Sequence, residues 1–280
     1  MNRPQSRPFT QVDVFTDVAL RGNPLAVVHD GDGLTDAQMQ EFARWTNLSE
    51  TAFLMHPSDP DADYRVRIFT PARELPFAGH PTLGSCHAWL EQGGTARHAH
   101  EVVQQCGVGL VRIRRNAGRL AFAAPPRKRT GPVEPEVLAQ IVRSLRIDAN
   151  AIKSSQWVDN GPGWVAVMLG SRAELLAVKP DYVAMRGLEL GAVAPWADGD
   201  AQFEVRAFVP DNGGYEDPVT GSLNASLAQW LIGAGLAPST YVASQGSALG
   251  RAGRVHVERD GETIWVGGGS VSCVRGQVSI

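Results

Sequence analysis

The sequence predicts an α/β protein, of the α+β kind, built from two related halves. With 280 residues, the chain is too long for one ordinary hydrophobic core and about right for two. Its 30 glycines and 18 prolines indicate many turns, so short strands should outnumber long helices. Similar motifs also recur in the same order along the two halves, which is typical of a duplicated unit.

The composition gives no reason to expect a nucleic-acid or membrane partner. The net charge is −3, so the basic surface that binds nucleic acid is missing. The sequence has no run of about 18 apolar residues, and its beginning lacks the apolar stretch of a signal peptide. We therefore expect a cytoplasmic protein.

The cysteines and histidines do not predict a disulfide or a metal site. The three cysteines are widely spaced and odd in number, which is typical of reduced thiols. The closest histidine pairs have no carboxylate or cysteine arranged to complete a metal site, and we expect no metal. The cysteines are Cys86, Cys106 and Cys273.

Two short motifs occur once in each half, about 138 residues apart. An R-x-F-x-P motif at residues 67–71 returns at 206–210, and an [H/D]-P-x-x-G-S motif at 80–85 returns at 217–222. A helical pattern follows each second motif, and an asparagine-containing turn precedes an apolar strand earlier in each half. The ordered set indicates a duplication rather than a chance match.

The first half should contain several strands interrupted by two helices. Thr35 and Asp36 predict the start of a helix that runs to about residue 45, and a second helix should open near Pro81. Runs of apolar residues and two-residue alternation predict strands around 11–15, 24–28, 49–55, 63–69, 101–105 and 109–115.

A Pro-rich, charged stretch at 123–132 is expected to link the halves. We therefore place the first domain at 1–125 and the second at 126–269. The second half should repeat the order of the first, with a helix at 134–145, the repeated loop and helix, and strands at 254–260 and 263–268. The tail is expected to form one more strand.

The repeated loops are the candidate active site because each places an ionisable residue near the start of a helix. Proline is favoured in a first helical turn, and glycine there lets the backbone approach a ligand closely. The unpaired N–H groups and the dipole of a helix N-terminus bind anions. If the halves pack face to face, both helix ends converge on one cleft that can hold a small carboxylate. The alternative is that His80 and Asp217 are ordinary N-caps.

Glu50 is the candidate acid/base group. It lies in the strand-like run 48–54, which is otherwise apolar or small. Burial would raise the pKa of its carboxyl group toward neutrality, where general acid/base catalysis works best. The alternative is an edge-strand glutamate that points to solvent or pairs with Arg65 or Arg67.

The sequence resembles the PhzF-like family of phenazine biosynthesis in the segments QVDVFTDVALRGNPLAVV, LSETAFL, YRVRIFTPARELPFAGHPTLG, FEVRAFVP, YEDPVTGSLNASLAQWL and QGSALGRAGRVHV. These matches stay in order from about residue 10 to the end of the chain. The resemblance implies the diaminopimelate epimerase-like fold: two pseudo-symmetric domains, each a barrel-like, mostly antiparallel sheet around a central helix. It also implies that the last strand, about 270–280, returns to the first domain.

The resemblance further implies a cofactor-independent isomerase. In such an enzyme Glu50 removes a proton from a small carboxylate-bearing substrate and returns it to another carbon, so that a double bond shifts. The predicted catalytic residues are Glu50, His80, Asp217 and Ser222, and the predicted substrate-binding residues are Gly79, Thr220, Gly221 and Asn224. Relatives are often homodimers, and a homodimer is compatible with this sequence.

Two departures from the family pattern affect the expected chemistry. Epimerases of this fold use two thiols at helix ends, but residues 79–85 and 212–222 contain no cysteine, and Cys86 lies about one turn too far along. Leu223 and Asn224 stand where many relatives carry alanine and often histidine, which leaves open a substrate other than the phenazine precursor. Two alternatives stay open: a thiol-independent epimerase or racemase that uses Glu50 and Asp217 as its bases, and a catalytically silent small-molecule-binding protein.

Overall fold

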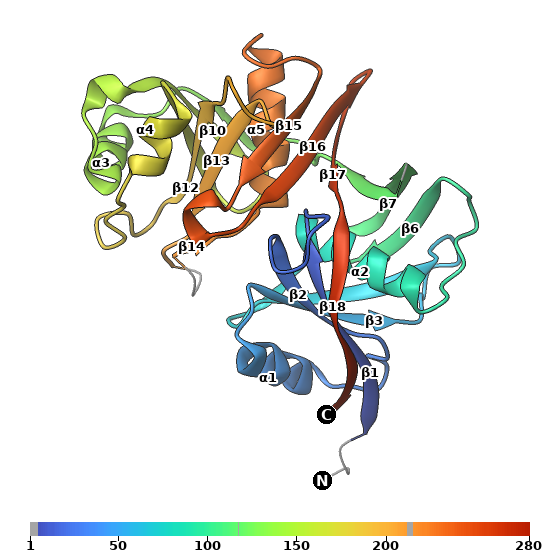
Figure 1. Ribbon diagram of the computed structural model, residues 1–280. Coiled ribbons are helices and arrows are strands. Elements are labelled where there is room, and N and C mark those ends of the chain that lie inside the picture. Colours follow the sequence, from blue (N-terminus) through green and yellow to red (C-terminus); the bar gives the residue numbers. More distant parts are fainter. Residues whose placement is uncertain (1–4, 117, 212–214) are drawn as a thin grey trace. The chain divides into compact units, whose positions relative to one another are not determined.

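The computed structural model describes residues 5–116, 118–211 and 215–280, and it divides into two compact units. Unit 1 comprises residues 1–123 and 267–280, and unit 2 comprises residues 124–266. Residues 1–4, which belong to the first predicted domain, lie outside the described residues. The predicted α+β class is confirmed, because strands outnumber helices among the described residues of both units (Figure 1).

Unit 1 is a curved sheet wrapped around one helix. Its strands pair in the order β18-β1-β2-β3-β4-β6-β7-β8, and the short strand β5 pairs with β4. Helix α2 packs against strands near both ends of this order, β18 and β8 included, so the sheet must curve around it (Figure 1). The elements are β1 (Ser6–Val14), β2 (Asn23–Val28), α1 (Asp36–Thr46), β3 (Glu50–Met55), β4 (Tyr64–Phe69), β5 (Glu74–Leu75), α2 (Gly79–Glu91), β6 (Glu101–Cys106), β7 (Gly109–Asn116), β8 (Arg119–Ala123) and β18 (Ser270–Ser279).

Unit 2 has the same plan. Its strands pair in the order β9-β10-β11-β12-β13-β15-β16, the short strand β14 pairs with β13, and α5 packs against β10 and β16. Strand β17 (Thr263–Gly268) spans the point in the sequence where unit 2 ends and unit 1 resumes. The other elements are β9 (Arg129–Gly131), α3 (Pro135–Leu145), the 3₁₀ helix η1 (Ala149–Ala151), β10 (Ile152–Asp159), β11 (Trp164–Leu169), α4 (Arg172–Ala177), β12 (Glu189–Pro195), β13 (Phe203–Phe208), β14 (Glu216–Asp217), α5 (Gly221–Gly233), β15 (Thr240–Gln245), the 3₁₀ helix η2 (Ser247–Leu249) and β16 (Gly253–Asp260).

The sequence predicted a linker at 123–132, but part of this stretch belongs to the sheet of unit 2. Its second part forms β9, which pairs antiparallel with β10. The guanidinium group of Arg129 lies 3.5 Å from the centre of the Trp157 ring and 2.7 Å from the carboxylate of Glu134. This cation–π contact and ion pair hold the segment against unit 2.

The central helices are enclosed because their residues are small or apolar on every side. Residues 79–86 of α2 and 223–228 of α5 are buried without interruption. Gly84 shows how closely α2 approaches the sheet, since a Cβ atom there would lie 2.7 Å from Cδ2 of Leu25. Among the described residues, no helix is both long enough and apolar enough to cross a membrane.

The two units repeat the same succession of elements. The parallel pairs β2–β3 and β4–β6 of unit 1 correspond to β11–β12 and β13–β15 of unit 2. A helix lies between the strands of the first parallel pair in each unit, α1 in unit 1 and α4 in unit 2. The central helices α2 and α5 each follow a two-residue strand and have the same length.

The structure corrects the alignment of the repeated loops. Both central helices begin with a glycine, so His80 is equivalent to Ser222, and not to Asp217 as the H-P-x-x-G-S match implied. Asp217 instead takes the place of Leu75, because both pair with equivalent residues of the preceding strand. The mismatch arises because the same Pro, Gly and Ser spacing lies inside α2 at residues 81–85 but spans the start of α5 at residues 218–222.

A bidentate arginine–glutamate pair explains the repeated R-x-F-x-P motif. Arg67 donates from Nε and Nη2 to the two carboxylate oxygens of Glu74, at 2.7 and 2.6 Å. Arg206 makes the same two bonds to Glu216, at 2.9 and 2.8 Å. Each guanidinium group also lies over the phenylalanine two residues further on, 5.1 and 4.9 Å from the ring centre. These pairs fix the two-residue strand that leads into each central helix.

We predict that the two pairs contribute unequally to stability. In unit 2 the side chains of Arg206 and Glu216 are 5% and 4% exposed, whereas Glu74 in unit 1 is 41% exposed. Glu216→Ala would leave a buried, uncompensated guanidinium group and should lower the free energy of unfolding by about 3–5 kcal/mol. Glu74→Ala should cost at most about 1 kcal/mol. Urea unfolding checks both, and equal losses would contradict the assignment.

Candidate active site

The predicted site residues form two groups, one in each unit. Each group lies at the N-terminal end of a central helix and on the strands beside it. Unit 1 contains Glu50, Gly79 and His80, and unit 2 contains Asp217, Thr220, Gly221, Ser222 and Asn224.

Glu50 is the first residue of β3, where it pairs with Leu25 of the parallel strand β2. Its side chain is 16% exposed, and Oε2 lies 3.4 Å from Nε2 of His80. Of the alternatives left open by the sequence, pairing with Arg67 does not occur, since that arginine binds Glu74 and Asp36. The carboxylate therefore lies at the start of the central helix and mostly out of solvent.

His80 is a neutral imidazole in this position. The residue is 4% exposed, and burial lowers its pKa to about 3. The amide nitrogen of Asn23 lies 3.4 Å from Nδ1 and can only donate, so Nδ1 accepts. The ring proton is then on Nε2, which faces Glu50. Nε2 of His80 lies 3.4 Å from Oε2 of Glu50 but makes no hydrogen bond to it, so the neutral ring borders the carboxylate without adding a charge.

The sequence left open that His80 and Asp217 are N-caps, but neither of them is. The N-cap residues are Ala78 for α2 and Thr220 for α5, and neither makes a side-chain capping bond. Gly79 and Gly221 are the first helical residues, and their N–H groups have no acceptor within the helix. Both helix starts therefore retain the donors and the dipole that attract an anion.

Asp217 is held by the residue that caps its own helix. The hydroxyl group of Thr220 donates a 2.6 Å hydrogen bond to Oδ2 of Asp217. This charge-assisted bond favours the ionised carboxylate and fixes its orientation. Thr220 was predicted to bind substrate, and in the structure its hydroxyl group is engaged with Asp217.

Gln245 was not among the residues predicted from the sequence, yet it organises the loop that contains Asp217 and Thr220. The fully buried side chain accepts hydrogen bonds from the backbone N–H of Thr220 (3.0 Å) and from the amide of Asn224 (2.8 Å). Its own amide donates to the carbonyl oxygen of Asp217 (3.1 Å) and to the hydroxyl group of Thr220 (2.9 Å). Asn224 donates its other amide hydrogen to the Thr220 carbonyl oxygen, so the donors of this amide are used within the protein.

Ser222 occupies the place in α5 that His80 occupies in α2. Its Oγ accepts a 3.1 Å hydrogen bond from Nε1 of Trp164, and its carbonyl oxygen accepts one of 2.9 Å from the amide of Asn160. In both units an asparagine thus contacts the second residue of the central helix: Asn23, the first residue of β2, and Asn160, which lies between β10 and β11. The asparagine-containing turns of the sequence repeat have this structural role.

Thiol chemistry has no support at these helix starts. Cys86 lies in the second turn of α2 and is fully buried. Burial raises the pKa of its thiol group to about 12, so the reactive thiolate is not formed near neutral pH. Among the described residues, no group of three histidine, cysteine, aspartate or glutamate side chains could hold a metal ion.

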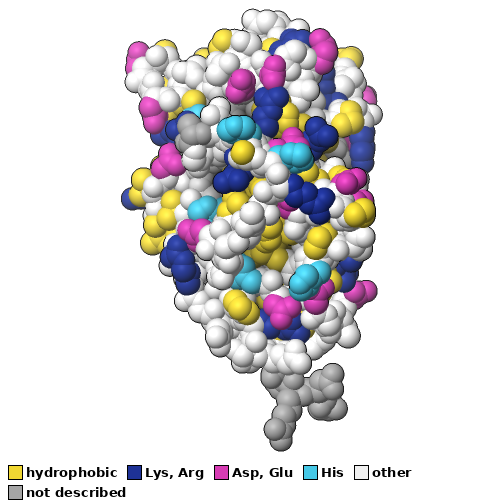
Figure 2. Space-filling view, turned by 90° about the vertical axis from the view of Figure 1, so that its right-hand side faces the viewer, with side chains coloured by type: hydrophobic (Ala, Val, Ile, Leu, Met, Phe, Trp, Pro, Cys, Tyr) yellow, Lys and Arg dark blue, Asp and Glu magenta, His cyan; other side chains and the backbone are white. Residues whose placement is uncertain are grey.

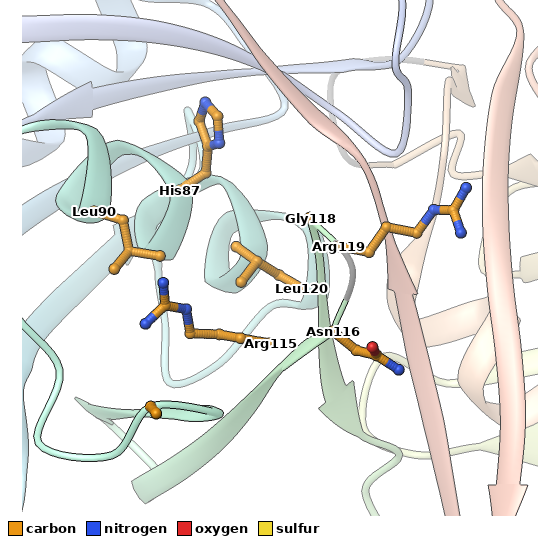
Figure 3. Close-up of a pocket in the computed structure, with 8 residues that line it drawn as sticks. His87, Leu90, Arg115, Asn116, Gly118, Arg119 and Leu120 are labelled. Atoms are coloured by element: carbon orange, nitrogen blue, oxygen red, sulfur yellow. The ribbon is translucent and has the colours of Figure 1, made fainter.

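The pocket shown in Figure 3 is separate from the predicted residues. It has a volume of about 310 Å³ and lies beside the C-terminal half of α2, whereas His80 lies at the start of that helix. His87 and Leu90 project from the helix, and Arg115 extends toward them from β7 (Figure 3). Figure 2 shows basic and acidic side chains interspersed over the face that it displays, in keeping with the small net charge.

Comparisons with known proteins give consistent matches over the whole chain. The family model described as phenazine biosynthesis-like protein matches residues 12–276. A trans-2,3-dihydro-3-hydroxyanthranilate isomerase of Pseudomonas fluorescens is 32% identical, with 95% of this chain and 97% of the relative covered. Antisense-enhancing sequence 1 of Schizosaccharomyces pombe is also 32% identical, with 96% and 97% covered. A solved structure described as a predicted epimerase from Pseudomonas aeruginosa has a TM-score of 0.79 and 27% identity, with 97% and 99% covered. The predicted diaminopimelate epimerase-like fold is confirmed.

We predict that Gln245→Leu destabilises the protein through the loop that carries Asp217. The substitution leaves the buried N–H of Thr220 and an amide hydrogen of Asn224 without their acceptor. Each orphaned donor should cost about 1–3 kcal/mol in urea unfolding. Gln105→Leu is the matched control, since its bonds to Ser58 and Asp59 lie at the surface, and it should change the value by about 0.5 kcal/mol or less.

We also predict a pH-dependent contribution from His80. Its folded pKa lies below the unfolded value of 6.5, so below that pH the unfolded state binds more protons. The free energy of unfolding should therefore fall as the pH is lowered from 6.5 toward 3, by up to about 1.4 kcal/mol per pH unit from this group. His80→Gln should remove that part of the slope. A difference between wild type and variant that stays constant from pH 7 to about pH 4.5 is the contradicting result.

Proposed function

The chain belongs to the phenazine biosynthesis-like protein family, and from that premise we propose that it is a cofactor-independent isomerase that moves a proton and a double bond in a small, carboxylate-bearing substrate. Several curated relatives are named isomerases. The residues proposed for the site lie at the N-terminal ends of the two central helices, with Glu50 and His80 in unit 1 and Asp217 and Ser222 in unit 2. The observation that carries the proposal is the contact between Glu50 and the neutral imidazole of His80.

Glu50 is the proposed proton-transfer group. As a carboxylate it takes a proton from an allylic carbon, and the electron pair of that C–H bond enters the conjugated system of the substrate. The protonated carboxyl group then returns the proton to another carbon, which completes the double-bond shift. The neutral ring of His80, 3.4 Å from Oε2, is proposed to hold the carboxylate in place without protonating it.

The substrate carboxylate is proposed to bind at the helix starts. The N–H groups of Gly79 and Gly221 supply donors, and the Ser222 hydroxyl group adds one more. Asp217, oriented by Thr220, is proposed to bind an amino or hydroxyl group of the substrate. In this scheme Thr220 acts through Asp217, and Asn224 supports the loop with its carbonyl oxygen left to accept a bond. The cytoplasmic location, the homodimer and the absence of nucleic-acid and membrane partners remain predictions from the sequence.

An epimerase is the second candidate, because one similar solved structure is described as a predicted epimerase. In that case Glu50 would remove a proton from a stereocentre and Asp217 would return one to the opposite face. The two candidates share their residues and differ in where the proton is returned. A protein that binds the same ligand without turnover is the outcome that would refute both.

We predict that deuterium incorporation distinguishes these activities. The protein is incubated in D₂O with trans-2,3-dihydro-3-hydroxyanthranilate, the substrate named for a relative, and with a panel of unsaturated carboxylates and amino acids. NMR should show deuterium at a shifted carbon, and label at an inverted stereocentre would instead identify the epimerase. Glu50→Gln should slow incorporation by about 10²–10⁴-fold, the typical contribution of a general base.

Glu41→Gln is the matched control for this experiment, since that glutamate is exposed on α1 in the same unit. It should leave the rate of incorporation unchanged. Tight binding of a panel member by the wild type, with neither deuterium incorporation nor a shifted double bond or inverted stereocentre in the recovered compound, would show a binding protein. Incorporation that is equally fast in Glu50→Gln would remove Glu50 from the mechanism.

A further inference from the structure

The segment between β10 and β11 brings two hydrogen-bond donors to one residue of the proposed site. The amide of Asn160 donates to the carbonyl oxygen of Ser222 (2.9 Å), and the indole N–H of Trp164 donates to its Oγ (3.1 Å). All three residues belong to unit 2. Ser222 is therefore held through its backbone and through its hydroxyl group by one short stretch of chain.

This stretch of chain is itself fixed. Oδ1 of Asp159 accepts hydrogen bonds from the N–H groups of Gly161 (2.6 Å) and Gly163 (2.7 Å). Gly163 has a φ of 100°, a backbone conformation that glycine adopts readily. Trp164 is the first residue of β11, is 2% exposed, and pairs in parallel register with the first residue of β12. Its indole N–H therefore reaches Ser222 from a fixed position.

The indole bond determines how the Ser222 hydroxyl group can act. A serine hydroxyl has one hydrogen to donate and two lone pairs that can accept, whereas an indole N–H can only donate. Because Trp164 uses a lone pair of Oγ, the hydroxyl hydrogen is directed away from the indole.

The helix itself does not use this hydrogen. A serine inside a helix can donate to the carbonyl oxygen three or four residues earlier. Ser226 does so, with bonds to the carbonyl oxygens of Ser222 (3.0 Å) and Leu223 (3.2 Å). Ser222 is the second residue of α5, so the carbonyl groups three and four positions earlier lie before the helix. Within the part of the chain that the structure describes, its hydroxyl group donates no hydrogen bond, and the residue is only partly buried.

The equivalent position of unit 1 follows the same rule. There the amide of Asn23 lies 3.4 Å from Nδ1 of His80 and leaves the ring hydrogen on Nε2. In each unit a group that can only donate thus occupies a lone pair of the second helical residue. Each of these residues is left with a hydrogen to offer.

We propose that Trp164 is a positioning residue of the site, which fixes Ser222 as a hydrogen-bond donor to an oxygen of the substrate carboxylate. This inference rests on the proposed function, which supplies the contact between Ser222 and the substrate. Trp164 acts through the serine and makes no contact with the substrate. Without the indole N–H the hydroxyl group is free to rotate, so the donor is no longer oriented before the substrate binds.

Trp164→Phe tests the role of the indole N–H, because it keeps an aromatic ring and removes the donor. The substrate is trans-2,3-dihydro-3-hydroxyanthranilate, or the panel member that the protein turns over. We expect KM to rise by about 3–10-fold and kcat to change by less than about twofold. Trp157→Phe is the matched control, since that buried indole donates to Glu134, the N-cap residue of α3, and it should leave KM unchanged.

A double-mutant cycle separates this role from a general effect on the fold. Ser222→Ala should raise KM, and adding Trp164→Phe to it should raise KM no further, because the indole acts only through the hydroxyl group. Increases in KM that multiply in the double variant would show that Trp164 supports the site by packing alone, and they overturn the inference. If thermal unfolding shows that Trp164→Phe does not fold, benzothienylalanine at position 164 makes the same test, since it replaces the N–H by sulfur within the same bicyclic shape.

The outcomes separate this inference from the proposed function. If Ser222→Ala raises KM and a folded Trp164→Phe variant leaves it unchanged, the positioning role is refuted and the isomerase stands. If Glu50→Gln is inactive and neither variant changes KM, Ser222 does not bind the substrate, so the inference fails while the general base stands. If no compound shows Glu50-dependent exchange, the proposed function fails and the role of Trp164 fails with it.

Discussion

The constraint on which the rest of the structure depends is the enclosure of one helix inside each curved sheet. Buried backbone N–H groups need partners, and the first turn of a helix has none within the helix. Neither α2 nor α5 supplies a side-chain cap. Polar side chains lie at this end of each helix, His80 with Asn23 in unit 1 and Ser222 with Asn160 in unit 2, but these contacts accept no bond from the N–H groups of the first turn. The same lack of a cap leaves donors for an anionic ligand.

Duplication preserved this framework while the groups that it holds diverged. Both units keep the bidentate arginine–glutamate pair before the central helix, but only the pair in unit 2 is sealed from solvent. Gln245 organises the loop of Asp217 in unit 2, and Cys106 stands at the equivalent register position in unit 1. A histidine and a serine occupy the second position of the two helices. The two units thus share one architecture but carry different side chains at the start of the central helix.

The fold could largely be predicted because it is marked by local and repeated sequence patterns. The contacts of the candidate site were predicted less completely because they join residues that are far apart in the sequence. Short motifs located the central helices and their order, and family resemblance implied the fold and predicted Glu50, His80 and the loop of Asp217 as site residues. The register of that loop was misjudged because a short Pro, Gly and Ser spacing recurs at different distances from the start of the two helices. Gln245 was missed since its bonds reach residues more than twenty positions away. The strand β9 was missed because it depends on Trp157, far along the chain.

The last strand of the chain has a consequence for biosynthesis. Strand β18 pairs with β1 along its whole length, from Ser6 opposite Ser279 to Val14 opposite Ser270. While the ribosome is still translating, all residues of unit 2 become available before β18 does. Until residues 270–279 have been synthesised, β1 keeps one open edge, and open edges recruit other chains. The open edge of β1 is thus covered only after all of unit 2 has been synthesised, and a chaperone that shields β1 would act on unit 1 rather than on unit 2.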